Sequence, residues 1–321
     1  MHFDVFNGDA DGILSLVQLR KAAPKLSTLV TGVKRNINLL EGIHIEKGDE
    51  ITVLDISMKK NQVDLRRLLS DDAQVFYADH HQTGDIPQHK NLEVHVDTNA
   101  DICTALIIDR FLGSKYHHWA IAGAYGDNLH AVADRLTQQA RLSLKQREQL
   151  KQLGTLVNYN SYGEQLEDLI IDPKDLYLEL VQFNDPFSAV SEDGAALSNL
   201  QKAYQQDFEW AMQQAAHYKT EILRVFKLPN LSVSRRISGT LGNHLANQAP
   251  DCAHLVLTEN SNGQYTVSLR APLRHKFGAG SLCQQFASGG GREAAAGINH
   301  FDIRELPNFI EQVESYYHQN L

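Results

Sequence analysis

The sequence has few cysteines and no long apolar run. Its three cysteines, Cys103, Cys252 and Cys283, lie far apart and form no C-x-x-C pair. A disulfide framework and a zinc cluster are therefore not expected, and we expect each cysteine to be a small buried residue. No stretch approaches the roughly 18 consecutive apolar residues of a membrane span. Because the start of the chain also lacks the basic and apolar regions of a signal peptide, the expected location is the cytoplasm.

The sequence also lacks a cluster of basic residues. Its formal net charge is −9 over 321 residues, and no run of Lys and Arg is present. Proteins that grip long nucleic acid usually carry a basic face that neutralises many phosphates. We therefore expect neither a long duplex nor a membrane as partner. A phosphate-bearing substrate would be small, and the positive charge at its site would come largely from bound cations.

Short apolar strands alternate with helical patterns in the first part of the chain, which predicts an α/β domain with a mainly parallel sheet. The expected strands are residues 3–6, 50–54, 73–77 and 92–96, and the expected helices are residues 13–19, 59–69 and 103–112. Residues 136–180 are also predicted to be mainly helical, with a turn-rich interruption at 158–163.

The last hundred or so residues have a different pattern. Pro186 marks an expected boundary, and residues 192–224 are predicted to form a long helical connection. Strands are expected at 231–233, 254–257 and 265–269, followed by a glycine-rich loop and an alanine-rich helix. The expected division is a first domain at 1–186, a helical linker at 187–225 and a smaller α/β domain at 226–321.

Acidic and histidine side chains follow three of the expected strands. They are Asp9 with Asp11, Asp55, and the triplet Asp79–His81. Taken singly, the two aspartates could belong to a turn and Asp55 could cap a helix. In open α/β sheets, however, ligands bind beyond the carboxyl ends of the strands, where all of these residues are expected.

The triplet is the most informative of these segments. One carboxylate and two imidazoles in succession are costly to place near a core without a purpose. Imidazole and carboxylate together suit Mn²⁺, Fe²⁺ or Zn²⁺ better than Ca²⁺. Asp127, which follows an apolar helical run, adds a fourth acidic position to the series.

With its acidic and histidine segments in this order, the chain resembles the DHH/DHHA1 phosphoesterase family. Within that family it resembles the oligoribonuclease (nano-RNase-like) branch. The matching segments are Asp9-Ala10-Asp11, Asp55, Asp79-His80-His81, Gly126-Asp127 and Gly289-Gly290-Gly291-Arg292-Glu293-Ala294-Ala295-Ala296-Gly297, the last of which is similar to the GGGH-x-x-AAG signature. Cys103-Thr104-Ala105 also resembles a helix start found between the third and fourth motifs.

The resemblance implies a catalytic DHH domain and a DHHA1 substrate-binding domain, with the active-site cleft between them. Two divalent cations, usually Mn²⁺, would be held by Asp9, Asp11, Asp55, His80 and Asp127. Asp55 would bridge the two cations, and His81 would lie near the scissile phosphate. Such a cation pair activates water and neutralises phosphate charge, so no Ser or Cys nucleophile is required.

The sequence departs from the family pattern at two positions, one expected to bind a cation and one expected to bind the substrate. Many members carry a His a few residues before D-x-D, whereas the corresponding segment here is Val5-Phe6-Asn7-Gly8, in which Asn7 is the candidate substitute. Arg292 stands where the signature usually has His, and its planar donor fork suits a terminal phosphate. The expected substrate contacts are Asn7, Arg270, Gly289, Gly290, Gly291 and Arg292.

The leading functional prediction is a phosphodiesterase that converts short linear oligonucleotides to mononucleotides. Its expected substrates are 5′-phosphorylated dinucleotides of the pGpG or pApA type, which arise when cyclic dinucleotides are opened. The alternatives are a single-strand exonuclease, a phosphoadenosine phosphate phosphatase, an inorganic pyrophosphatase and a non-catalytic nucleotide sensor. The sequence leaves the oligomeric state open, and a homodimer is one of its options.

Overall fold

The computed structural model describes residues 1–191 and 195–320, so residues 192–194 of the expected helical connection, and Leu321, lie outside the described part. The chain divides into two compact units, Met1–Lys202 and Ala203–Leu321. The division falls within helix α9 (Ala195–Met212). The domain boundaries expected at 186 and 225 stay predictions.

The first unit contains a five-stranded parallel sheet in the order β2-β1-β3-β4-β5. Its strands are β1 (His2–Phe6), β2 (Thr28–Val30), β3 (Glu50–Leu54), β4 (Gln74–Asp79) and β5 (Leu92–Val96). The parallel α/β fold class is thereby confirmed. The three-residue edge strand β2 was not predicted, because it is too short to show an alternating pattern.

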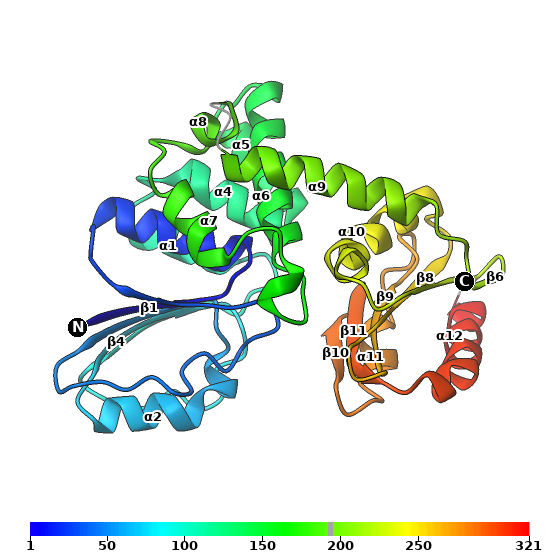
Figure 1. Cartoon of the computed structure of the whole chain (residues 1–321), viewed down its shortest axis with the longest axis horizontal. Coiled ribbons are helices and arrows are strands. Elements are labelled where there is room, and N and C mark those ends of the chain that lie inside the picture. The colour runs from blue at the N-terminus through cyan, green and yellow to red at the C-terminus, as the bar shows by residue number, and fades with distance from the viewer. Residues whose placement is uncertain (192–194, 321) are drawn as a thin grey trace. The chain divides into compact units, whose positions relative to one another are not determined.

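Helices cover both faces of this sheet. In Figure 1, α2 (Gln62–Ser70) lies below the sheet, and α1 (Ala10–Ala22) lies above it. Side chains such as Val53, Leu65 and Leu68 form the core between the sheet and α2. The other helices of this unit are α3 (Thr104–Phe111), α4 (His117–Gly126), α5 (His130–Gln139), α6 (Leu144–Asn160), α7 (Pro173–Leu180) and α8 (Pro186–Ser191), with short 3₁₀ turns at Met58–Lys60 and Leu166–Asp168.

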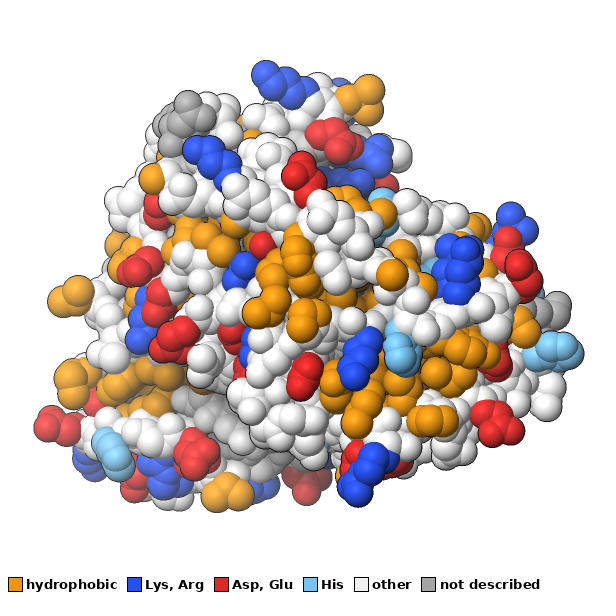
Figure 2. Space-filling view, turned by 45° about the vertical axis from the view of Figure 1, so that its right-hand side comes forward, with side chains coloured by type: hydrophobic (Ala, Val, Ile, Leu, Met, Phe, Trp, Pro, Cys, Tyr) orange, Lys and Arg blue, Asp and Glu red, His pale blue; other side chains and the backbone are white. Residues whose placement is uncertain are grey.

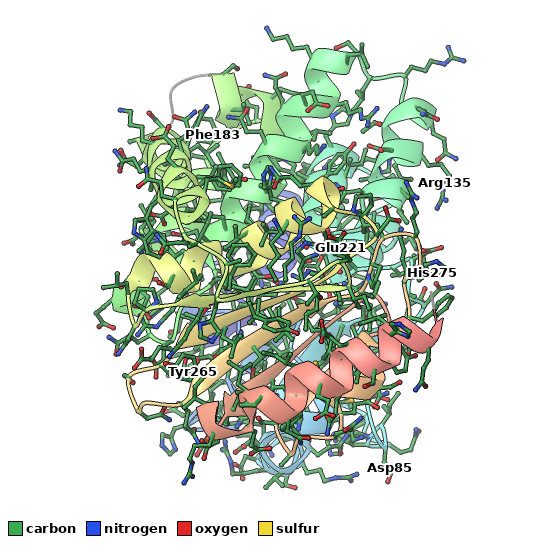
Figure 3. All side chains as sticks on the ribbon, turned by 90° about the vertical axis from the view of Figure 1, so that its right-hand side faces the viewer. Asp85, Arg135, Phe183, Glu221, Tyr265 and His275 are labelled. Atoms are coloured by element: carbon green, nitrogen blue, oxygen red, sulfur yellow. The ribbon has the colours of Figure 1, made fainter. Side chains whose placement is uncertain are left out.

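The second unit contains a six-stranded sheet in the order β10-β11-β9-β8-β7-β6, in which β7 and β8 run parallel and the other neighbours antiparallel. Its strands are β6 (Tyr218–Lys219), β7 (Leu223–Leu228), β8 (Ala253–Glu259), β9 (Tyr265–Arg270), β10 (Gly289–Arg292) and β11 (Ala295–Phe301). Its helices are α10 (Ser232–Gln248), α11 (Ala279–Cys283) and α12 (Leu306–Asn320), the last preceded by a 3₁₀ turn at Ile303–Glu305. Figure 3 shows α12 lying across this sheet, and Phe309 and Val313 of α12 belong to the same buried core as Val267 and Leu269 of β9.

Three expectations for this part of the chain are wrong. Residues 231–233 start α10 instead of forming a strand, because Leu231 is the N-cap of a helix that buries Ile237 and Leu241. The helical connection ends at Met212, and β7 occupies residues 223–228. Residues 293–297 belong to a β-hairpin, since Ala295 and Ala296 pair with both β10 and β9. Pairing with two strands outweighs the high helix propensity of alanine.

The expectation that the cysteines are buried is confirmed for Cys103, Cys252 and Cys283, and all three are free thiols in this structure. In the part of the chain that the structure describes, no helix combines the length and the hydropathy needed to cross a bilayer.

Candidate metal centre

The acidic and histidine residues converge at one edge of the first sheet. Strands β1, β3 and β4 are neighbours and run parallel, so their carboxyl ends meet at the same edge. Asp9 and Asp11 follow β1, Asp55 follows β3, and His80 follows β4. The order of the strands therefore accounts for the convergence of residues that are far apart in the sequence.

Asp9 is the N-cap of α1. One of its carboxylate oxygens accepts hydrogen bonds from the backbone N–H groups of Asp11 (3.0 Å) and Gly12 (3.1 Å). These bonds satisfy two of the unpaired N–H groups at the start of the helix. Asn7 holds the same loop, because its side-chain oxygen accepts from the N–H of Asp9 at 3.2 Å and its amide donates to the carbonyl of Lys34 at 3.4 Å.

Asp11 is buried and is held by the start of a second helix. The N–H groups of Thr104 and Ala105, in the first turn of α3, each donate a 2.7 Å hydrogen bond to one of its two oxygens. A helix N-terminus is a favourable environment for an anion. The Cys103-Thr104-Ala105 segment therefore orients a carboxylate of the site.

Asp55 is buried in the cluster and has a strained backbone. Its φ angle is +59°, in the left-handed region that residues other than glycine rarely adopt. Only 2% of the residue is exposed, and Thr104 donates to its carboxylate at 3.2 Å. Burial, together with the neighbouring carboxylates of Asp9 and Asp11, raises the pKa of Asp55 well above its ordinary value. Strain of this kind is concentrated at functional sites.

His80 presents one nitrogen to this cluster. Its Nδ1 donates to the carbonyl oxygen of Ile102 at 3.0 Å, so Nε2 carries the free lone pair. Nε2 lies 3.4 Å from a carboxylate oxygen of Asp55 and 3.8 Å from one of Asp11. A histidine fixed through its other nitrogen is the usual arrangement of a metal ligand.

His81 has a different environment from His80. Its Nδ1 lies 2.7 Å from a carboxylate oxygen of the fully buried Asp79, and 46% of its side chain is exposed. Burial lowers the pKa of His81, but the hydrogen bond to Asp79 and the charge of Asp55 outweigh burial and raise it to about 9. A pKa of about 9 favours the imidazolium form of His81 at neutral pH, and Asp79 orients this side chain at the rim of the cluster. Its position is compatible with the predicted role near a phosphate.

Asp127 follows the last residue of α4. One of its carboxylate oxygens, Oδ2, is buried and has no hydrogen-bond partner among the described residues. Burial and the carboxylate of Asp11 raise the pKa of Asp127. A buried carboxylate oxygen without a donor is costly unless a cation or a proton compensates it.

These donors fit a divalent cation. Asp55, His80 and His81 each offer a ligand atom, and these atoms lie within 4.8 Å of one another. The nitrogen of His81 that lies 3.8 Å from Asp55 is already paired with Asp79, so His81 is not counted among the ligands. The unpartnered oxygen of Asp127 and the mutual repulsion around Asp55 show that part of the negative charge of the cluster is not compensated. A mixed carboxylate and imidazole set suits a first-row transition metal such as Mn²⁺.

Sequence patterns gave no sign of Lys34, which also belongs to this site. Its ammonium nitrogen lies 2.5 Å from Oδ2 of Asp9 and 3.1 Å from the side-chain oxygen of Asn158. Lys34 follows β2, and a three-residue strand gives no periodic signal by which its end could be located.

The predicted substrate contacts of the second unit lie on strand β10 and at the end of strand β9. Gly289–Arg292 is the edge strand β10 rather than a loop before a helix, so no helix dipole supports it. The side chain of Arg292 is exposed. Arg270, at the end of β9, donates at 2.8 Å to both Asn243 and Ser268. The substrate role of these residues, and the cleft between the two domains, stay predictions.

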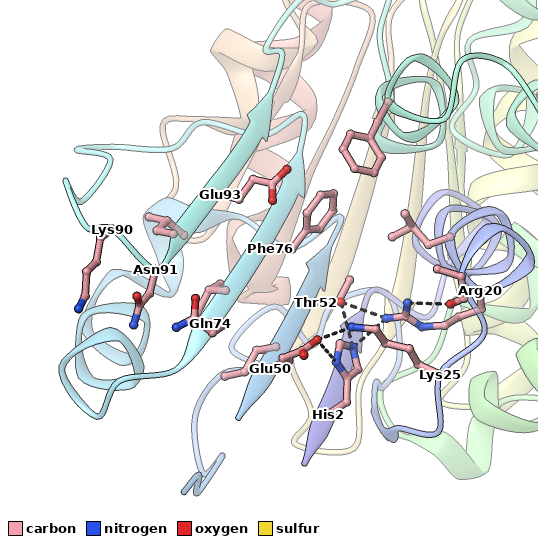
Figure 4. Close-up of a pocket in the computed structure, with 16 residues that line it drawn as sticks. His2, Arg20, Lys25, Glu50, Thr52, Gln74, Phe76, Lys90, Asn91 and Glu93 are labelled. Carbon is pink, nitrogen blue, oxygen red and sulfur yellow. Dashed lines mark hydrogen bonds and ion pairs between the residues drawn. The ribbon is translucent and has the colours of Figure 1, made fainter. Parts of the chain in front are cut away.

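A pocket of about 520 Å³ lies at the opposite, amino ends of the same strands (Figure 4). Several of its polar side chains pair with one another. Arg20 donates to Thr52 at 3.0 Å and contacts His2 at 2.8 Å, and Lys25 forms an ion pair with Glu50. The pocket has neither the buried carboxylate cluster nor its unpartnered oxygen, so we assign the functional site to the carboxyl ends of the strands.

No protein-family model matches the chain, and no curated protein matches it. Several solved structures share its fold. The pGpG-specific phosphodiesterase PggH from Vibrio cholerae is 14% identical, with a TM-score of 0.60 and 99% of each chain covered. Exonuclease RecJ bound to manganese is 17% identical, with a TM-score of 0.55, 99% of this chain covered and 90% of that chain.

A second RecJ structure, in complex with Mn²⁺ and from Thermus thermophilus, is 17% identical with a TM-score of 0.58. The likeness covers 99% of this chain but 52% of that one, so the chain spans about half the length of this RecJ. At these identities the comparisons establish the fold, and the oligoribonuclease branch stays a prediction. The chain therefore shares the α/β fold of these solved structures, and its ordered motifs resemble those of the DHH/DHHA1 phosphoesterase family.

Proposed function

We propose that the chain hydrolyses phosphodiester bonds of short linear nucleotides with the help of a divalent cation. The observation that carries this proposal is the convergence of Asp11, Asp55 and His80. Asp127 interacts electrostatically with Asp11 and His80 and has a buried oxygen without a partner among the described residues. A cation bound there would supply activated water and neutralise phosphate charge. Mn²⁺ is the first candidate, and the second cation predicted from the sequence is not required by this geometry.

The chain's own residues would orient the substrate. The imidazolium of His81, held by Asp79 at 2.7 Å, can donate to an oxygen of the phosphate on which negative charge develops. Arg270 and Arg292, with the backbone N–H groups of β10, are the proposed contacts for the rest of the nucleotide.

The surface charge supports a short substrate. The formal net charge is −9, and on the face drawn in Figure 2 Lys and Arg side chains are interspersed with Asp and Glu. This face shows no continuous basic track of the kind that an exonuclease uses along a single strand. The likeness to a pGpG-specific phosphodiesterase supports 5′-phosphorylated dinucleotides of the pGpG or pApA type as first substrates.

The proposal is tested by incubating the purified chain and Mn²⁺ with a panel of phosphate esters. The panel contains pGpG, pApA, longer single strands, phosphoadenosine phosphate and pyrophosphate, and products are identified by mass. Mononucleotides formed fastest from the dinucleotides are the expected result. Faster cleavage of long strands would favour an exonuclease, whereas binding without turnover would favour a nucleotide sensor.

The predictions about surroundings and assembly remain open to experiment. The cytoplasmic location stays a prediction. A short nucleotide is the proposed partner, and a homodimer remains the option to test by measuring the mass in solution.

A further inference from the structure

The ammonium group of Lys34 lies inside the acidic cluster. It forms an ion pair with Asp9 at 2.5 Å and donates to Asn158 at 3.1 Å, and it lies 5.6 Å from the ring centroid of Tyr162. About a quarter of the side chain is exposed (27%). The nearby carboxylate of Asp127 also interacts with it electrostatically. Lys34 is therefore a fixed positive charge among carboxylates that were predicted to bind only metal ions.

The backbone around Lys34 is fixed from two sides. Its N–H donates to the carbonyl of Ser161 at 3.0 Å, and its carbonyl accepts from the amide of Asn7 at 3.4 Å. The preceding loop reaches the D-x-D segment because Gly8 has no side chain. A Cβ atom at Gly8 would overlap the carbonyl oxygen of Gly32. The position of the ammonium group is thus built into the fold.

The residues that would hold a second cation are already engaged. Asp9 uses one oxygen to cap α1 and the other to pair with Lys34. Asn7, the candidate substitute for the missing histidine, uses its side-chain oxygen and its amide within the loop. A cation bound to Asp9 would lie against the ammonium group of Lys34, because this group already pairs with Oδ2 of Asp9.

The other side of the cluster has the opposite character. Nε2 of His80 faces Asp11 and Asp55, because Nδ1 is bound to a carbonyl. The Oδ2 atom of Asp127 has no hydrogen-bond partner among the described residues. The oxygens of Asp11 accept backbone N–H bonds, and a carboxylate oxygen that accepts one such bond keeps a lone pair for a cation.

We propose that Lys34 takes the place of a second divalent cation, so that the centre binds one cation at Asp11, Asp55, His80 and Asp127. The inference deepens the proposed function and rests on it. An ammonium group is a compact charge with three donors, of which Asp9 and Asn158 take two. The third donor is then available for a phosphate oxygen, where a second cation would otherwise act.

The number of Mn²⁺ ions bound per chain tests this inference without any assay of activity. Titration calorimetry and metal analysis after equilibrium dialysis count the ions, and electron paramagnetic resonance distinguishes an isolated Mn²⁺ from a spin-coupled pair. We expect one isolated Mn²⁺ per chain. Two ions per chain, or a spin-coupled pair, would overturn the inference, as would a chain that binds none.

Variants separate the contributions of Lys34 and Asp9. In Lys34→Met the oxygen of Asp9 is released, and we expect a second, weaker Mn²⁺ to bind, whereas Lys34→Arg and the exposed control Lys47→Met keep one. Asp9→Asn should also keep one Mn²⁺, because Asp9 is not a ligand. A second ion that fails to bind to folded Lys34→Met, or a loss of Mn²⁺ in Asp9→Asn, contradicts the proposal.

Failure of this inference can be distinguished from failure of the proposed function. One Mn²⁺ per chain without hydrolysis of any phosphate ester would remove the function and leave the inference standing. Two Mn²⁺ per chain with hydrolysis would do the reverse.

Discussion

His80 and Ile102 are joined by a hydrogen bond in which Nδ1 of the imidazole donates to the backbone carbonyl at 3.0 Å. This bond determines which nitrogen of His80 faces the acidic cluster, because a carbonyl can only accept. The loop before α3 therefore orients His80, the proposed metal ligand that follows β4. The same segment holds Asp11 through the N–H groups of Thr104 and Ala105.

His80→Asn separates the two functions of this side chain. The amide of Asn can still donate to Ile102, but no nitrogen reaches Asp55. We expect the free energy of unfolding to change little and the affinity for Mn²⁺ to fall on the order of 100-fold or more. Calorimetric titration with Mn²⁺ and urea unfolding measure the two effects. Unchanged Mn²⁺ affinity in the folded variant would mean that His80 is not a ligand.

His81→Gln should have the complementary effect. The variant removes the imidazolium beside Asp79 but none of the proposed metal ligands, so kcat should fall by about 10²-fold while Mn²⁺ binding stays unchanged. The exposed His44→Gln is the matched control and should behave like the wild type. A kcat within a few fold of wild type would rule out contact between His81 and the reacting phosphate.

The parts of this centre that could be predicted are those at strand ends. The apolar strands before Asp9, Asp55 and His80 have clear patterns, and parallel neighbours bring their ends together. Lys34 could not be found in this way. Its partners, Asp9 and Asn158, lie 25 and 124 residues away, and the strand that precedes it has three residues.

The second unit shows a related limit of sequence patterns. Glycines followed by alanines predicted a loop and a helix, but the segment forms β10 and β11 because Ala296 pairs with Leu269 of β9. The strands at 254–257 and 265–269 were predicted correctly, since each alternates or is apolar over enough residues. Local propensity decides only where tertiary pairing does not.

Two glycines of β10 give a matched pair of substitutions. Gly291 has a φ angle of +139°, and a Cβ atom there would lie 2.5 Å from the Cα of Ala296. A Cβ atom at Gly290 would have no other atom within 4 Å. Gly291→Ala should lower the free energy of unfolding by about 1–3 kcal/mol, whereas Gly290→Ala should leave it unchanged. Urea unfolding followed by circular dichroism compares them, and equal stability of both variants would contradict the strand geometry.

Acid should destabilise the first unit through Asp4. Its carboxylate is fully buried and accepts from Arg20 and from Ser27. Although burial raises the pKa of Asp4, hydrogen bonds from Arg20 and His2 lower it from 3.8 to about 2. The folded state therefore favours the carboxylate, and this stabilisation is complete above about pH 4 and is lost as the pH falls towards 2.

The shift corresponds to about 2 kcal/mol of unfolding free energy. Urea unfolding between pH 5 and about 2.5 measures it. Asp4→Asn leaves the guanidinium of Arg20 without its buried partner, so the variant should be less stable at neutral pH and lose this part of the acid dependence. The exposed Asp101→Asn should keep it. An identical pH profile in wild type and Asp4→Asn would contradict the assignment.

Side chains at the ends of three parallel strands are proposed to hold a cation that serves phosphodiester hydrolysis. The most direct test is the mass of the products formed from pGpG by the wild type with Mn²⁺, with Mn²⁺ removed by a chelator, and by folded His80→Asn. We expect GMP in the first reaction alone. Equal GMP in all three reactions, or none in the first from pGpG or any other phosphate ester, would contradict the proposed role of the cation.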